Sequence, residues 1–224
     1  MSAAARSALV AVSSVLVVAG LAVALLLTPG FVRFGVAAAD APALRELGRS
    51  SALQAAEAAR RYVAGRGDRL AADAGFDAAT SDHLADVRGV VAGVRWTAVV
   101  SLVCLANLLA HAVSHGTQFE VARGLRWGGR ASLALAIGAA ALGAADFTTA
   151  FVAFHKVFFP QGGWVFPDDA LIIRLFPERF WALAGAGLLA LLAAGGAVLL
   201  LGAAFVRKAL DEQPASATGA PLGD

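Results

Sequence analysis

Apolar residues are concentrated in four long runs, and the segments between these runs carry most of the charge. The runs extend from Ala8 to Leu27, from Trp96 to Val113, from Ala131 to Phe154 and from Trp181 to Val206. Each run is close to or above the length of about 20 helical residues that crosses about 30 Å of hydrocarbon. The pattern therefore predicts an all-α membrane protein with four transmembrane helices.

The first run has an alternative interpretation as the core of a cleaved signal peptide. The small residues Ala37, Ala38 and Ala39 would then supply the cleavage site. The apolar stretch is longer than a typical signal core, however, and these alanines lie far beyond its end. We therefore expect an uncleaved helix.

Basic residues in the short segments beside the runs predict how the chain is oriented. They precede the first run, lie between the second and third, and follow the fourth: Arg6, Arg123, Arg126, Arg130, Arg207 and Lys208. Basic residues in short flanks favour the cytoplasmic side. We therefore expect both termini on the cytoplasmic side of the membrane.

The predicted organisation follows from the runs and their flanks. It consists of 1–28 (N-terminus and first span), 29–95 (extracytoplasmic loop with short helices), 96–113 (second span), 114–130 (cytoplasmic loop), 131–154 (third span), 155–180 (extracytoplasmic loop), 181–206 (fourth span) and 207–224 (disordered cytoplasmic tail). Within the first loop the pattern predicts a helix from Pro42 to Val63 and another from about Asp82 to Val91, capped by Thr80 or Ser81. These helices are expected to form a cap on the membrane surface.

Composition narrows the function classes. Hydrophobic residues make up 59% of the 224-residue chain, which is typical of membrane proteins. The net charge of +2 is too small to indicate nucleic-acid binding. The single cysteine, Cys104, lies in an apolar run and is expected to be a packing residue.

Histidines on the predicted extracytoplasmic side are candidates for proton transfer. His83 shares a helix face with Asp86, so a carboxylate could orient its ring. His155 ends the third run among aromatic residues, where partial desolvation favours the neutral, base-competent ring. The other pair, His111 and His115, has the spacing of two metal ligands but no acidic partner, so we expect interfacial polar residues and no metal site.

Other polar residues near the same surface are further candidates. Asp146 is the one acid within a predicted span, and an intramembrane carboxylate is by default a functional suspect. On an unbroken helix it would lie about 13 Å from His155, so it would instead brace another helix or the loop. The loop 155–180 alternates apolar anchors with charges and suggests a segment packed into the interface.

The order of these residues resembles the signature of a bacterial family of four-helix membrane proteins, the lipoprotein intramolecular transacylase (Lit) family. The resemblance is carried by His83 to Val87, by Asp146-Phe147, by Phe154 to Phe159, and by Trp164, Asp169, Leu171-Ile172 and Pro177 to Phe180. The segment Gln161-Gly162-Gly163 departs from it, because an Asn-Asp pair is expected there.

The resemblance implies an acyltransferase that moves the sn-2 acyl chain of a diacylglyceryl-cysteine lipoprotein onto the amino group of that cysteine. It implies His83 and His155 as the catalytic pair at the extracytoplasmic face, supported by Asp86 and Asp146. Trp164, Asp169, Arg174 and Arg179 would contact the lipoprotein or a lipid headgroup. The implied partners are diacylglyceryl-modified lipoproteins and membrane lipid, with no cofactor.

Two alternatives stay open from the sequence. One is a non-enzymatic four-helix scaffold or accessory protein whose histidines only stabilise the loops. The other is a related lipid-modifying enzyme with a different acyl acceptor. A transporter is disfavoured because the spans contain a single charge and no pair of broken helices. Whether His83 and His155 face one cavity discriminates between these readings. Rings that converge within about 6 Å and open to lipid favour catalysis, and rings that point apart favour the scaffold.

Overall fold

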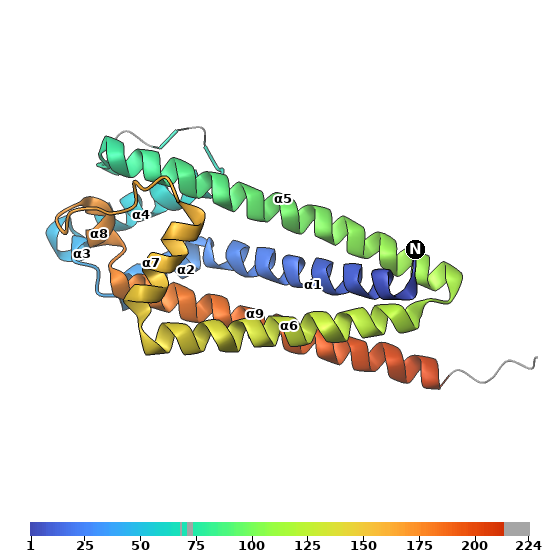
Figure 1. Ribbon diagram of the computed structural model, residues 1–224. Coiled ribbons are helices and arrows are strands. Elements are labelled where there is room, and N and C mark those ends of the chain that lie inside the picture. Colours follow the sequence, from blue (N-terminus) through green and yellow to red (C-terminus); the bar gives the residue numbers. More distant parts are fainter. Residues whose placement is uncertain (68, 71–73, 213–224) are drawn as a thin grey trace, which may run out of the picture.

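Four long helices form the body of the protein in a computed structural model that describes residues 1–67, 69–70 and 74–212 (Figure 1). They are α1 (Ala3–Leu26), α5 (Ala78–His115), α6 (Gln118–Ala145) and α9 (Glu178–Asp211), and each is long and apolar enough to cross a membrane. The described residues form helices and no strand. These features confirm the predicted all-α fold with four spans. The tail predicted to be disordered lies, beyond residue 212, outside the described residues.

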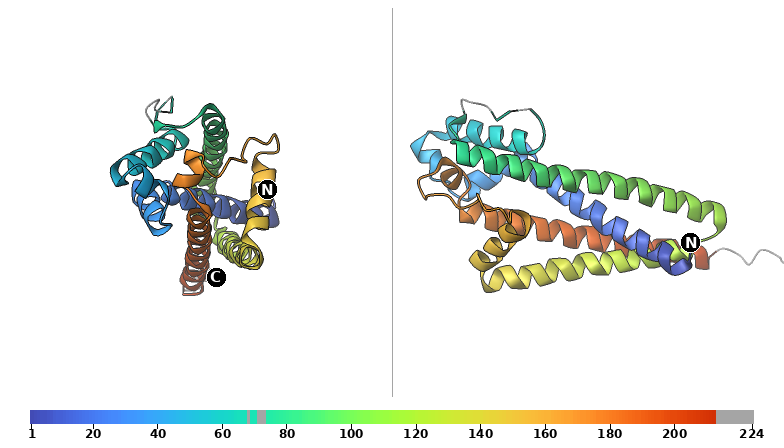
Figure 2. Two further views of the ribbon diagram at one scale, coloured as in Figure 1. Left: turned by 90° about the vertical axis from the view of Figure 1, so that its left-hand side faces the viewer. Right: turned by 45° about the horizontal axis from the view of Figure 1, so that its top comes forward.

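Helix α1 is the centre of the bundle and contacts α5, α6 and α9 (Figure 2). Helices α6 and α9 approach each other closely because glycines face one another. A Cβ atom on Gly129 would lie 2.7 Å from the carbonyl oxygen of Gly196, closer than real side chains approach. Small residues permit such contacts in lipid, where packing of backbones replaces the hydrophobic effect.

A helical cap covers one end of the bundle. It is formed by α2 (Pro29–Ala38), α3 (Ala43–Glu46), α4 (Arg49–Val63) and α8 (Leu171–Leu175), together with the first turns of α5 (Figure 1). Its core consists largely of small and branched apolar side chains, among them Val36, Ala52, Ala56 and Leu175. The cap is therefore a packed unit.

One buried arginine joins this cap to the bundle. The Arg60 side chain is 4% exposed, pairs with Glu57, and donates a 2.9 Å hydrogen bond to the carbonyl oxygen of Leu27. Leu27 is the C-cap residue of α1, so its carbonyl is one that the helix itself leaves unsatisfied. A charge buried in this way is tolerated because it is both paired and hydrogen-bonded.

The helices of the first loop differ from the sequence prediction in their boundaries. The helix expected from Pro42 to Val63 is divided at Gly48, whose φ of +79° favours glycine. The helix expected near Asp82 begins earlier, because Asp77 caps it by accepting a 2.7 Å hydrogen bond from the Thr80 amide. It then continues into the second span as one helix, α5.

The third apolar run is also interrupted. The backbone of Asp146 is extended, and its carboxylate accepts hydrogen bonds from the amide and the hydroxyl of Thr149, at 3.0 Å and 2.6 Å. This capping starts a new helix, α7 (Phe147–Phe158), which turns away from α6 towards α5 (Figure 1). The expected span 131–154 thus corresponds to the end of α6 and most of α7.

Candidate active site

The structure brings His83 and His155 together at the cap end of the bundle. His83 lies in the second turn of α5, and His155 lies in the last turns of α7. Their ring centroids are 6.1 Å apart, with an angle of 27° between the ring planes. The residues are 8% and 7% exposed, so both imidazoles are largely withdrawn from solvent. The turn of α7 at Asp146 makes this meeting possible.

Aromatic side chains enclose the pair. The Phe159 ring lies 5.0 Å from that of His83 and 5.7 Å from that of His155, between centroids. Phe166 lies 5.6 Å from His83, and Trp164 lies 4.9 Å from His155. Three of the five rings therefore come from the loop that follows α7. These rings shield both imidazoles from solvent and restrict their orientations.

The hydrogen bond of His155 fixes its tautomer. Its Nδ1 lies 2.9 Å from the carbonyl oxygen of Phe151, which only accepts, so Nδ1 carries the proton and donates. In the neutral ring Nε2 then holds the lone pair. Burial lowers the pKa of His155, although this hydrogen bond opposes the shift. His155 is therefore suited to accept a proton at Nε2 near neutral pH.

His83 is different because its Nδ1 is buried without a hydrogen-bond partner among the described residues. Burial lowers the pKa of His83 most, repulsion from protonated His155 lowers it further, and the charge of Asp86 opposes both. His155 directly follows the last residue of the third apolar run, Phe154, and Arg88 and Arg95 separate His83 from the second run. An unsatisfied buried ring nitrogen costs free energy unless a ligand binds there.

Asp86 contacts a residue that the sequence did not single out for the site. Gln161 Nε2 donates a 2.9 Å hydrogen bond to its carboxylate. No hydrogen bond joins Asp86 to His83 within the described chain, so Asp86 acts on that ring through its charge. Gln161 belongs to the segment that departs from the family pattern, and this departure was the one sequence feature that pointed to it.

The remaining candidates lie at other positions. Asp146 is exposed and caps α7, so its hydrogen bonds position the helix that carries His155. Arg174, in α8, forms an ion pair with Glu46 of α3 and thereby closes the cap. Asp169 and Arg179 are exposed, and among the described residues neither forms an ion pair.

The second pair of histidines lies at the opposite end of α5. The rings of His111 and His115 stack with 4.0 Å between their centroids, and His115 Nδ1 donates to the carbonyl oxygen of His111. Across the described ranges no three His, Cys, Asp or Glu side chains converge as metal ligands. The arrangement has the stacked, exposed character of interfacial polar residues.

Fold and site together define a multi-span helical membrane protein with a buried, aromatic-walled histidine pair under a cap. The chain belongs to the lipoprotein intramolecular transacylase Lit family, whose family model matches residues 8–181. It is accordingly an acyltransferase that acts on lipoproteins in the membrane.

Solved structures with the same fold come from Bacillus cereus. The membrane-integral lipoprotein intramolecular transacylase Lit of that organism is 18% identical, with a TM-score of 0.83, and the match covers 93% of this chain and 97% of that one. Two variants of it with one histidine replaced, by arginine or by alanine, are 16% identical with TM-scores of 0.74. They cover 93% of this chain, and the match spans 93% and 95% of theirs. No curated protein sequence matches the chain.

Proposed function

We propose that this protein transfers the sn-2 acyl chain of a diacylglyceryl-cysteine lipoprotein to the α-amino group of the same cysteine, at the extracytoplasmic surface. The observation that carries the proposal is the pair of buried imidazoles, His83 and His155, with 6.1 Å between ring centroids. At that distance one reacting group can contact both imidazoles. The basic residues at the opposite end of the bundle support cytoplasmic termini.

The reaction needs no co-reactant because it is an isomerisation. The neutral amine nitrogen attacks the ester carbonyl carbon, so a C–N bond forms and the bond from that carbon to the sn-2 oxygen breaks. The nitrogen loses one proton and the glyceryl oxygen gains one, which leaves an amide and a free hydroxyl. In this proposal His155 Nε2 accepts the proton from the nitrogen and returns it to the departing oxygen.

His83 supplies the second function in this scheme. Its pKa is lowered, so near neutral pH the ring is neutral and donates an N–H hydrogen bond to the oxyanion of the tetrahedral intermediate. The buried Nδ1, which has no partner among the described residues, is the nitrogen suited to this bond. The charge of Asp86 stabilises any positive charge that develops on the ring.

The aromatic walls support migration over hydrolysis. Phe159 is 3% exposed and touches both histidines, so little water reaches the space between them. Donor and acceptor belong to one substrate molecule, and the site needs only to hold them in contact. Asp169, exposed in the loop after α7, and Arg179, exposed in the first turn of α9, are proposed to contact the lipid headgroup or the polypeptide. Arg174 is instead held by Glu46.

The test is to express the protein in bacteria that lack transacylase activity and to sequence a lipoprotein's N-terminal peptide by tandem mass spectrometry. Fragmentation is required because acyl migration leaves the intact mass unchanged. The expected result is an acyl group on the cysteine nitrogen with the wild type and with His111→Ala, and none with His155→Ala. An unacylated nitrogen with the wild type present in the membrane would refute the proposal.

A further inference from the structure

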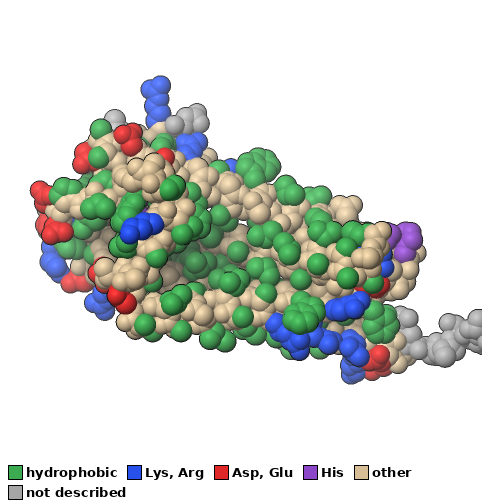
Figure 3. Space-filling view, viewed as in Figure 1, with side chains coloured by type: hydrophobic (Ala, Val, Ile, Leu, Met, Phe, Trp, Pro, Cys, Tyr) green, Lys and Arg blue, Asp and Glu red, His purple; other side chains and the backbone are tan. Residues whose placement is uncertain are grey.

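A small cavity lies between α6 and α9 at the end of the bundle opposite the histidine site. Its volume is about 310 Å³, and it is lined by Phe119, Ala122, Arg123, Arg126 and Arg207. The four residues from α6 are spaced so that they share one face of that helix. Arg207 faces them from α9. Figure 3 shows Lys and Arg side chains gathered at this end.

Three guanidinium groups and no carboxylate line the cavity. The nearby acids are engaged elsewhere: Glu120 pairs with Arg6, and Glu212 lies 3.7 Å from Lys208. Within the described ranges neither Arg126 nor Arg207 forms an ion pair, even though Asp211 lies one turn after Arg207.

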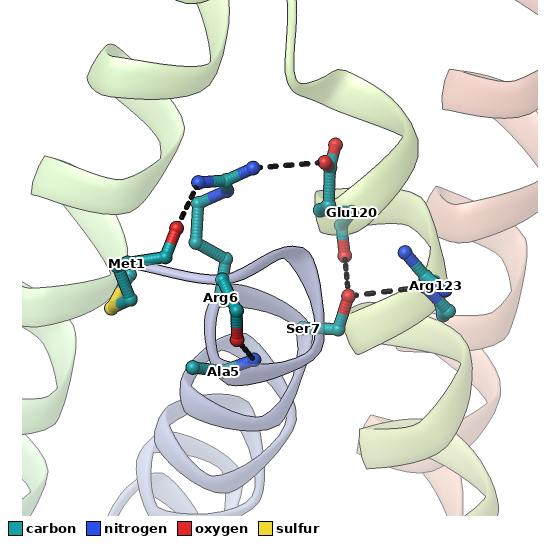
Figure 4. A network of polar contacts seen from close by, with 7 residues as sticks. Met1, Ala5, Arg6, Ser7, Glu120 and Arg123 are labelled. Carbon is teal, nitrogen blue, oxygen red and sulfur yellow. Dashed lines mark hydrogen bonds and ion pairs between the residues drawn. The ribbon is translucent and has the colours of Figure 1, made fainter.

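The network around Glu120 fixes one of the three arginines. Arg123 Nε donates a 3.1 Å hydrogen bond to Ser7 Oγ, which in turn donates to the carbonyl oxygen of Glu120 (Figure 4). Only Nε is used in this way, so the terminal nitrogens of Arg123 are available to a ligand. Because the bond at Nε holds the Arg123 guanidinium in place, its two terminal nitrogens can donate in parallel to two oxygens of one phosphate.

Exposed aromatic residues place the cavity at the level of the lipid headgroups. Phe119, which lines it, is 54% exposed, and Trp127 and Phe205 nearby are 57% and 75% exposed. Aromatic side chains of this kind mark the boundary between hydrocarbon and headgroups. A ligand there can place a phosphate among the arginines and its glycerol against Phe119.

We infer that this cavity binds the phosphate of an anionic phospholipid. The orientation of the chain in the membrane does not by itself explain why three arginines line one cavity. The positive-inside rule requires basic residues at this end of the bundle but not their convergence. Arg130 and Lys208 satisfy that rule from the same two helices and lie outside the cavity lining. Basic cavities between spanning helices are a recurrent binding site for acidic headgroups.

The experiment measures retention of phosphatidylglycerol and phosphatidylcholine by the purified full-length protein in detergent, by native mass spectrometry during lipid titration. The double variant Arg126→Gln/Arg207→Gln is compared with Arg130→Gln/Lys208→Gln, which removes the same charge from the same helices. Each guanidinium is expected to contribute about fivefold, so the first variant should lose about 25-fold in phosphatidylglycerol affinity. The second should bind as the wild type does, and phosphatidylcholine should bind weakly to all three.

Equal losses in the two double variants, or equal affinity of the wild type for both lipids, would overturn the inference. Displacement of phosphatidylglycerol by millimolar inorganic phosphate would overturn its lipid assignment in favour of a small-anion site. Thermal unfolding of each variant without added lipid checks the fold. If the double variant unfolds, Arg207→Gln alone, at an exposed position, should still lose about fivefold.

Discussion

Gln161 donates a hydrogen bond of 2.9 Å to Asp86 and thereby joins the loop after α7 to the start of α5. The same loop carries Trp164 and Phe166, whose rings pack against His155 and His83. The bond therefore holds the aromatic wall over the histidine pair and fixes the Asp86 carboxylate, whose charge acts on His83. Gln161 is a positioning residue in this account.

Replacing Gln161 should weaken catalysis without abolishing it. Gln161→Ala removes one hydrogen bond to a carboxylate at an exposed position, so kcat should fall about three- to tenfold. The apparent pKa of the acidic limb should also shift, because Asp86 changes its orientation towards His83. Gln54→Ala, in α4, is the control. An unchanged rate and an unchanged pH profile would contradict the role given to Gln161.

The two histidines should act as one unit. Loss of a general base slows a reaction about 10²- to 10⁴-fold, and loss of an oxyanion donor slows it about 10²- to 10³-fold. We expect His155→Ala to be the more severe of the two, and His83→Ala/His155→Ala to be little worse than His155→Ala alone. Steady-state rates of all three variants check this. Fully multiplicative effects would show that the rings act independently.

Once kcat/KM is corrected for the fraction of substrate whose α-amino group (ordinary pKa about 7.7–8.0) is neutral, it should fall on acidification with a midpoint below about 6.5, the ordinary value for histidine. Burial lowers the pKa of both histidines, so each stays neutral to a lower pH than in the unfolded chain. Between the lowered pKa of a histidine in the folded protein and its higher pKa in the unfolded chain, the unfolded chain binds more protons. The free energy of unfolding therefore also declines as the pH falls through this window. The measurement is kcat/KM against pH, together with a separate titration of the substrate's amino group. A corrected acidic limb centred above about 6.5 would contradict the assignment.

Asp146 should affect activity through the direction of α7. Asp146→Ala removes the cap on the Thr149 amide and hydroxyl, so α7 should fray and His155 should lose its place beside His83. We expect a lower thermal unfolding temperature and a reduced rate. Asp146→Asn, which keeps a capping oxygen, should restore most of both. A rate that depends on the charge itself, with Asn as damaging as Ala, would argue for a chemical role.

The spans were predictable because each needs only length and apolar composition. The convergence of His83 and His155 was not, because it depends on α7 leaving the axis of α6 at Asp146. The signal was present, since Asp146 stands three residues before Thr149 as a capping residue does, but the apolar run around it concealed the break. Helix α2 was not predicted either, although a capping Thr28 followed by Pro29 is a typical helix start.

The buried Arg60 and the bond from Gln161 to Asp86 were beyond sequence reasoning. The hydrogen bond from Arg60 to the Leu27 carbonyl and the one from Gln161 to Asp86 each join residues that lie far apart in the chain. Their partners follow from tertiary packing, which no local pattern encodes.

A crossover experiment tests the central claim most directly. Purified protein acts on a mixture of two diacylglyceryl lipopeptides, one with a heavy acyl chain on a heavy peptide and one with both light, and tandem mass spectrometry reads the N-acyl products. The account predicts heavy-on-heavy and light-on-light products only, formed by the wild type and not by His155→Ala. Mixed products, or equal product with His155→Ala, would contradict intramolecular transfer at the histidine pair.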